Sequence, residues 1–127
     1  MLIGVLLPMR TGRGLNDRLH WAEKQRKVRA ERGEAFWTLR SHGPPPNVGL
    51  RTKVILTRIA RRSAVNWNPL DDDNLHGSLK GVRDGVADWL HVNDADPRIE
   101  WQYRQEEGAE WAVRVEVRSD LEEGADI

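Results

Sequence analysis

The sequence contains no cysteine and no long hydrophobic run. Without cysteine the protein has neither disulfides nor thiolate metal sites, so its composition is compatible with a reducing compartment. The apolar stretch at residues 1–7 is too short to span a bilayer and lacks the basic region of a signal peptide. We therefore expect a soluble cytoplasmic protein that is not secreted and has no membrane partner.

Several catalytic signatures are also missing. There is no glycine-rich phosphate loop, no nucleophile elbow and no dinucleotide fingerprint. The four histidines have no metal-ligand spacing, and each is expected to be a surface or packing residue: His20, His42, His76 and His91. We accordingly expect no small-molecule cofactor.

The 127 residues suffice for one domain with a hydrophobic core, but not for two. We expect a folded domain over residues 1–119 and a loose acidic tail over residues 120–127. Six tryptophans supply much of the apolar bulk, and the strand patterns assign most of them to the core: Trp21, Trp37, Trp67, Trp89, Trp101 and Trp111.

The net charge of zero conceals a strong asymmetry between the two halves of the chain. Residues 1–62 contain 14 Lys and Arg against 4 Asp and Glu, whereas residues 63–127 contain 6 against 16. Such a division favours a basic surface for a polyanion and a separate acidic site. The alternative is that the two halves interleave in space and neutralise each other.

Hydrophobic periodicity predicts a strand, a long helix and a second strand in the first half of the chain. The two strands cover residues 2–7 and residues 50–60. The helix begins at a cap formed by Asn16 or Asp17 and runs to about Ser41.

The second half is predicted to form a helix and two strands. The helix covers residues 73–90, and the strands begin near Ile99 and Trp111. Residues 106–108 supply a turn, so these two strands are expected to form a hairpin. The order β-α-β-α-β-β implies a single small α+β domain, with a mixed sheet of about four strands and the helices packed against it.

The predicted helix over residues 73–90 has two distinct sides. An apolar stripe at helical spacing is expected to be buried: Leu75, Leu79, Val82, Val86 and Leu90. A second stripe lies nearly opposite: Asp73, Gly77, Lys80 and Asp84. Small residues on this helix, including Gly81 and Gly85, lower its intrinsic stability but allow another backbone to approach closely.

Acidic residues gather at both ends of this helix. Asp71, Asp72 and Asp73 lie at its start, and Asp94 and Asp96 follow its end. Carboxylates brought together repel one another unless a cation lies among them, and Mg²⁺ is bound by one or two carboxylates with water and phosphate. The alternative is structural, because aspartate caps helices and Asp96 precedes a proline in an ordinary turn.

The helix itself separates the two acidic groups by about 25 Å, at 1.5 Å per residue. Asp94 therefore meets Asp73 only if the chain folds back along the helix. A second subunit is another way to bring acidic groups together. Two such groups with a nearby lysine would suit metal-assisted cleavage of a phosphodiester.

These residues resemble the RusA family of Holliday junction resolvases, which are small endodeoxyribonucleases of phages and prophages. The resemblance covers roughly residues 54–118. It rests on three short segments: Asp71-x-Asp73-Asn74-Leu75, then Lys80-x-x-x-Asp84-Gly85-Val86, then Asn93-Asp94 with Ile99 opening a strand.

The resemblance implies a homodimer that cuts branched DNA, such as a four-way junction, with Mg²⁺ or with Mn²⁺ in its place. It implies that Asp71, Asp73 and Asp94 are catalytic carboxylates that hold the metal, and that Lys80 is the catalytic lysine. The basic residues of the first half would then contact DNA: Lys24, Arg26, Lys27, Arg29, Arg61 and Arg62. The gene would belong to a phage or a bacterial host.

The chain departs from the family pattern at two places. The spacing between Leu75 and Lys80 is about one helical turn longer, so Lys80 is assigned by its distance to Asp84. An aspartate pair before the third strand is replaced by Asn93-Asp94, which leaves Asp94 as the ligand and Asp96 as its substitute.

Two other functions remain open on the sequence. The first is a catalytically inactive protein of the same fold that binds branched DNA, which the two departures favour. The second is a small structural or assembly protein in which the acidic cluster only caps a helix. Such a protein would have no affinity for DNA at moderate salt, and Mg²⁺ would not change its melting temperature.

Overall fold

The computed structural model describes residues 2–12, 20–62 and 69–119. Their elements follow the predicted order: β1 (Leu2–Leu7), α1 (Trp21–His42), β2 (Thr52–Arg61), α2 (Asp72–Ser78), α3 (Lys80–Leu90), β3 (Ile99–Gly108) and β4 (Ala112–Ser119). The α+β fold with a four-stranded mixed sheet is therefore confirmed. The expected acidic tail, residues 120–127, lies outside the described residues.

The predicted hairpin between the last two strands is wrong. The strand order is β1-β4-β2-β3, so β2 lies between β3 and β4. Residues 106–108 continue β3, and three residues carry the chain to the far side of β2. β2 is nearly all buried and pairs on both sides, in parallel with β3 and antiparallel with β4. A parallel pair needs a long crossover, which α2 and α3 supply.

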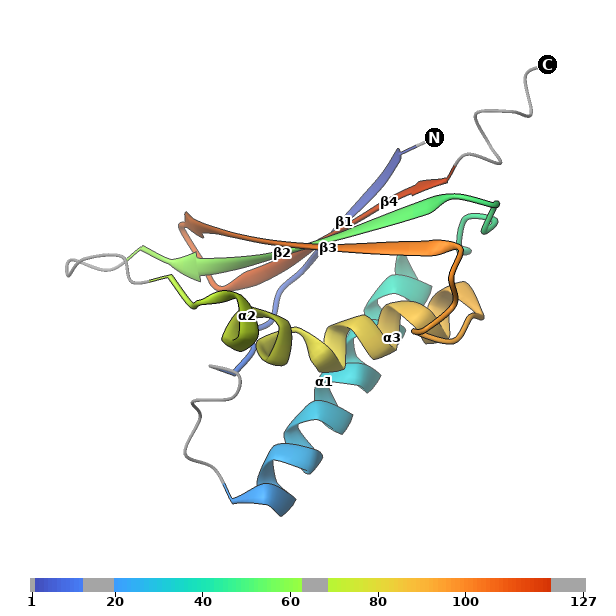
Figure 1. The fold of residues 1–127 in the computed structure, drawn as a ribbon. Coiled ribbons are helices and arrows are strands. Elements are labelled where there is room, and N and C mark those ends of the chain that lie inside the picture. Colours follow the sequence, from blue (N-terminus) through green and yellow to red (C-terminus); the bar gives the residue numbers. More distant parts are fainter. Residues whose placement is uncertain (1, 13–19, 63–68, 120–127) are drawn as a thin grey trace.

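All three helices lie on one side of the sheet (Figure 1). The predicted apolar stripe of the second helix is buried there, with exposed fractions between 0% and 5%: Leu75, Leu79, Val82, Val86 and Leu90. It packs on alternate residues of the sheet, including Val54, Leu56 and Val115. The helix predicted over residues 73–90 is divided at Leu79, so it appears as α2 and α3.

Helices α1 and α3 approach each other closely at two glycines, as the small residues predicted. A Cβ atom on Gly81 would lie 2.6 Å from the carbonyl oxygen of Val28, and one on Gly85 would lie 2.6 Å from that of Arg32. Arg32 also donates two hydrogen bonds, of 2.6 and 2.8 Å, to the Asp88 carboxylate on α3. This hydrogen-bonded guanidinium lowers the pKa of Asp88.

Two further predictions need correction. Helix α1 begins later than predicted, at Trp21, where the imidazole of His20 accepts a hydrogen bond from the backbone of Ala22. The proposed caps Asn16 and Asp17 lie outside the described residues.

Most of the described tryptophans are not in the core. Trp89 is buried, whereas Trp21 and Trp37 are 72% and 60% exposed, and Trp101 and Trp111 are half-buried. Trp21 and Trp37 lie on a helix, where strand alternation does not apply. Trp67, which was also predicted to be in the core, lies outside the described residues. None of the described helices is long and apolar enough to cross a membrane.

Candidate metal site and DNA-binding residues

The first acidic group lies at the start of α2. Asp71 is the N-cap, and its Oδ1 accepts hydrogen bonds from the backbone and side-chain nitrogens of Asn74, at 2.9 and 2.8 Å. Asp72 and Asp73 occupy the exposed first turn, and no ion pair joins either of them to another described residue. One carboxylate satisfies the cap. Asp73 and the Oδ2 atom of Asp71 are therefore available to a ligand.

This acidic turn is anchored to the helix-covered face of β3. The backbone N–H of Leu70 donates to the side-chain oxygen of Gln105 at 2.9 Å, and the side-chain nitrogen of Gln105 donates to the Leu70 carbonyl at 2.6 Å. The backbone of Arg58 pairs with that of Gln105, and the Arg58 side chain is buried. A buried cation therefore lies on the strand beside the residue that holds the acidic turn.

The second acidic group lies in the loop between α3 and β3, where arginines hold it. The guanidinium of Arg83 donates to the Asp94 carbonyl at 2.8 Å, and its Nε lies 3.6 Å from the Asp94 carboxylate. The indole of Trp101 donates to the same carbonyl at 3.0 Å. Arg98 pairs with Asp96 at 2.8 Å, and this hydrogen-bonded pair lowers the pKa of Asp96 to about 2.

Aromatic and polar side chains connect the two acidic groups along β3. Trp101 contacts the Asp94 loop, while the hydroxyl of Tyr103 accepts a hydrogen bond from Arg83 at 2.6 Å. The centroid of the Tyr103 ring also lies 4.0 Å from the centroid of the His76 ring on α2. Gln105 then holds the acidic turn of α2. Since Trp101 and Gln105 are four residues apart, these attachment points are separated by about 13 Å, at 3.3 Å per residue.

The structure thus keeps the predicted metal ligands in two places. Asp71 and Asp73 lie together at the start of α2, and Asp94 and Asp96 lie at the other end of the helical segment. Across residues 2–12, 20–62 and 69–119, no three His, Cys, Asp or Glu side chains gather closely enough to hold a metal ion. Asp71 and Asp73 supply two carboxylates, which suffices for Mg²⁺ when phosphate and water complete its coordination.

Lys80 lies with the second acidic group. Its amino group is 3.1 Å from both carboxylate oxygens of Asp84, one turn further along α3. It lines a hollow of about 350 Å³ whose other charged lining residues are Arg32, Asp84, Asp88 and Asp94. Because Lys80 follows Asp73 by seven residues, the two are about 10 Å apart along the helical segment.

The predicted DNA-contacting residues form two separate groups. Lys24, Arg26, Lys27 and Arg29 are on the first half of α1, which extends away from the sheet (Figure 1). Arg61 ends β2 and Arg62 follows it, with the Arg62 guanidinium 3.6 Å from the Glu107 carboxylate. This ion pair and that of Arg32 with Asp88 join the basic and acidic halves, so the two halves partly interleave.

Two arginines near the acidic groups are not among the residues predicted from the sequence: Arg58 and Arg83. Arg58 lies among β-branched residues of β2. It is two residues after Leu56 and four after Val54, so it lies on the same helix-facing side of the strand. A lone arginine at an inward position is the signal that would have selected it. Arg83 carries no comparable signal, because its partners are backbone and side-chain atoms of a loop and a distant strand.

The chain matches no protein-family model, and comparison with curated proteins found no match either.

Proposed function

We propose that this protein is a Mg²⁺-dependent, structure-selective DNA endonuclease that resolves four-way junctions. The observation that carries the proposal is the pair of carboxylates at the start of α2. Asp73 has no ion-pair partner among the described residues, and Asp71 uses a single oxygen for its cap. The resemblance to junction resolvases supports the same assignment, because it identifies these two positions as metal ligands.

In this proposal Asp71 and Asp73 hold the metal between them. Asn74 fixes the orientation of the Asp71 carboxylate, so that its free oxygen and the Asp73 carboxylate present negative charge at the exposed helix start. A bound divalent ion would polarise the scissile phosphate and lower the pKa of a water molecule. Mg²⁺ bound at such a site normally keeps several water ligands and also binds the substrate phosphate.

Lys80 is proposed to stabilise negative charge on the DNA phosphate. Its amino group is exposed, and its partner Asp84 lies on the same helix. The Lys80 side chain is 57% exposed and the Asp84 side chain 15%. On binding DNA, the lysine would exchange Asp84 for a phosphate.

The basic groups on α1 and at the end of β2 are proposed to contact the DNA backbone. Contacts of this kind are insensitive to sequence and weaken as salt rises. Symmetric cutting of a four-way junction needs two active sites, so the active form is proposed to be a homodimer.

The experiment that tests this function is incubation of the purified protein with a labelled four-way junction and, separately, a linear duplex. Paired nicks on opposing strands of the junction, present with Mg²⁺ and absent with EDTA, are the expected result. Absence of cutting at every Mg²⁺ and Mn²⁺ concentration, by folded protein that binds the junction, would overturn the nuclease assignment.

One observation favours a second candidate, a protein that binds branched DNA without cutting it. Arg83 contacts Asp94 and Lys80 contacts Asp84, so two of the four residues assigned to catalysis already have partners of opposite charge. If this second candidate is correct, the affinity for the junction should be the same with Mg²⁺ and with EDTA. If neither binding nor a Mg²⁺-dependent change in Tm is observed, the acidic turn is only a helix cap.

A further inference from the structure

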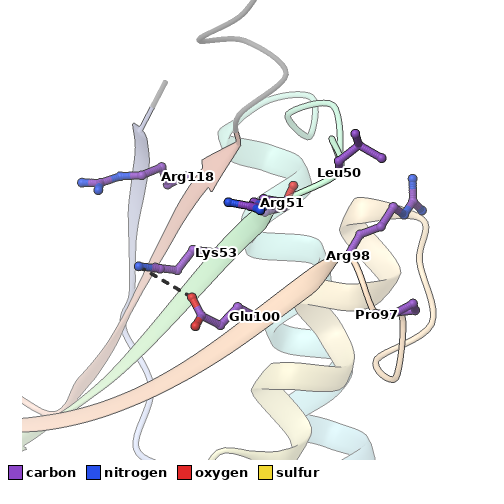
Figure 2. A pocket seen from close by; sticks show the side chains of 8 residues that line it. Leu50, Arg51, Lys53, Pro97, Arg98, Glu100 and Arg118 are labelled. Atoms are coloured by element: carbon purple, nitrogen blue, oxygen red, sulfur yellow. Dashed lines mark ion pairs between the residues drawn. The ribbon is translucent and has the colours of Figure 1, made fainter.

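A third basic cluster lies at the end of the sheet opposite the acidic turn of α2. It surrounds a hollow of about 500 Å³ formed where β2 and β3 begin and β4 ends. Four cations line this hollow, Arg51, Lys53, Arg98 and Arg118, and among the described residues Glu100 is the one acidic residue that lines it (Figure 2). We call these five residues the basic pocket.

Two cations of the basic pocket are placed where they repel each other, whereas Arg98 is paired with Asp96. Lys53 and Arg118 are directly opposed in the antiparallel pairing of β2 with β4. Like charges in this position destabilise a sheet unless an anion compensates for them. Glu100 compensates Lys53 in part, at 3.6 Å, whereas Arg118 is exposed and forms no ion pair with another described residue.

The register also shows which way the pocket faces. Lys53, Glu100 and Arg118 alternate with the helix-facing residues Val54, Trp101 and Val117. Their side chains therefore lie on the sheet face that no described helix covers (Figure 1). A ligand can reach them without moving any helix.

We propose that the basic pocket binds phosphate groups of a DNA arm that leaves the cutting site. The proposal rests on the function above only in taking branched DNA as the ligand. Cations contributed by two strands and two strand-flanking segments form a spread of charge that suits the repeated phosphates of a DNA backbone.

The dimensions set where along the DNA this contact falls. The acidic turn is held at Gln105, and the pocket lies beside Arg98 and Glu100, five to seven residues earlier in the chain. At 3.3 Å per residue this is about 20 Å. The two sites lie on opposite faces of the sheet, so about 20 Å is the shortest path between them. DNA rises 3.4 Å per base pair, so the pocket would contact phosphates at least about six base pairs from the cut.

The chain offers one competing ligand for these cations. Residues 120–127 follow Ser119 directly and contain four carboxylates: Asp120, Glu122, Glu123 and Asp126. If the cations serve this acidic segment, Arg118→Gln will lower the Tm of the full chain but not that of a chain ending at Ser119. The DNA affinity of the full chain will then be unchanged, and this result would overturn the proposal.

The direct experiment is fluorescence anisotropy titration of the full-length protein with a junction in EDTA, at several salt concentrations. Arg118→Gln should weaken binding and reduce the slope of log K against log salt by about 1, as expected for one phosphate contact. Arg118→Lys keeps the charge and should restore the slope. Arg104→Gln is the matched control, because Arg104 is exposed on the same face of the sheet but outside the pocket.

Arm length separates this contact from a general effect of charge. On a junction with arms of four base pairs, Arg118→Gln should bind like the unmodified protein, because the arms end before the pocket. An equal loss with short and long arms would overturn the proposal.

The pocket and the nuclease function fail independently. If the protein cuts the junction but Arg118→Gln has the same DNA affinity as Arg104→Gln, the proposed phosphate contact at the basic pocket is refuted. The proposed nuclease function is then retained. If the protein does not cut but its binding depends on Arg118, the nuclease is refuted and the pocket stands.

Discussion

The two acidic segments that flank the helices α2 and α3 look alike in sequence and differ in structure. Asp94 and Asp96 each lie beside an arginine, at 3.6 and 2.8 Å between charged atoms. Asp72 and Asp73 form no ion pair with another described residue. Among the described residues, arginines therefore compensate the charge of one segment, and no ion pair compensates that of the other.

This difference separates a structural role from a binding role. An arginine that donates hydrogen bonds to a loop holds that loop in one conformation, and Arg83 does so while also contacting Tyr103 on β3. Carboxylates without a partner repel one another, and a divalent cation relieves that repulsion. We therefore propose that a divalent ion binds at the start of α2 and that the Asp94 loop is part of the scaffold.

The largest expected effect comes from Asp73→Asn. Cleavage of a four-way junction should fall by at least about 100-fold, since even loss of an outer-shell partner of a metal ligand costs 10–100-fold. Binding in EDTA should be retained or become tighter, because repulsion between carboxylate and phosphate falls. Asp72→Asn is the matched control, as an exposed carboxylate in the same turn, and should retain most of the cleavage rate.

The next effect concerns stability. Arg83→Gln removes hydrogen bonds to Tyr103 and to the Asp94 carbonyl, so the free energy of unfolding should fall by about 1–2 kcal/mol. Urea denaturation measures this change. A variant as stable as the original protein would show that the arginine does not hold the loop, and the contrast between the two acidic segments would be lost.

A smaller effect is expected for Asp94→Asn. Because Asp94 is attached to β3 about 13 Å from the acidic turn, cleavage should fall by less than tenfold. The measurement is the single-turnover rate on the same junction used for Asp73→Asn. A loss as large as that of Asp73→Asn would mean that Asp94 joins the metal in the active state, as the family resemblance implies, through a second subunit or a change of conformation.

The smallest effect is electrostatic. The hydrogen-bonded Arg98 lowers the pKa of Asp96 to about 2, so Arg98→Gln should return this pKa toward its ordinary value of about 3.9. The depressed pKa means that the pair stabilises the fold above about pH 4 and ceases to do so as the pH falls toward 2. An NMR titration of the Asp96 carboxyl carbon tests this, and an unchanged pKa in Arg98→Gln would contradict it.

Elements defined by local pattern were predictable from the sequence. The apolar stripe from Leu75 to Leu90 selected the residues that are buried, and the glycines at 81 and 85 correctly indicated close approach by another backbone. Both depend on residues a few positions apart, whose relative orientation the helical repeat determines.

Strand order and the grouping of the acidic residues were not predictable in the same way. The alternation in β3 and β4 is compatible with a hairpin, and it carries no information that β2 will lie between them. In the same way, the spacing of Asp73 and Asp94 along the chain does not show that Arg83, Trp101 and Gln105 hold them apart. These outcomes depend on long-range pairing, which a single sequence does not display.

We propose that a divalent ion binds at the start of α2 and not at the Asp94 loop. Titration of isotopically labelled protein with Mn²⁺, followed by amide NMR, tests this placement directly. We expect the signals of residues 71–75 to broaden first and those of residues 93–98 to remain sharp, and we expect Mg²⁺ to reverse the broadening. Broadening that begins at residues 93–98, or that appears at neither segment, would contradict it.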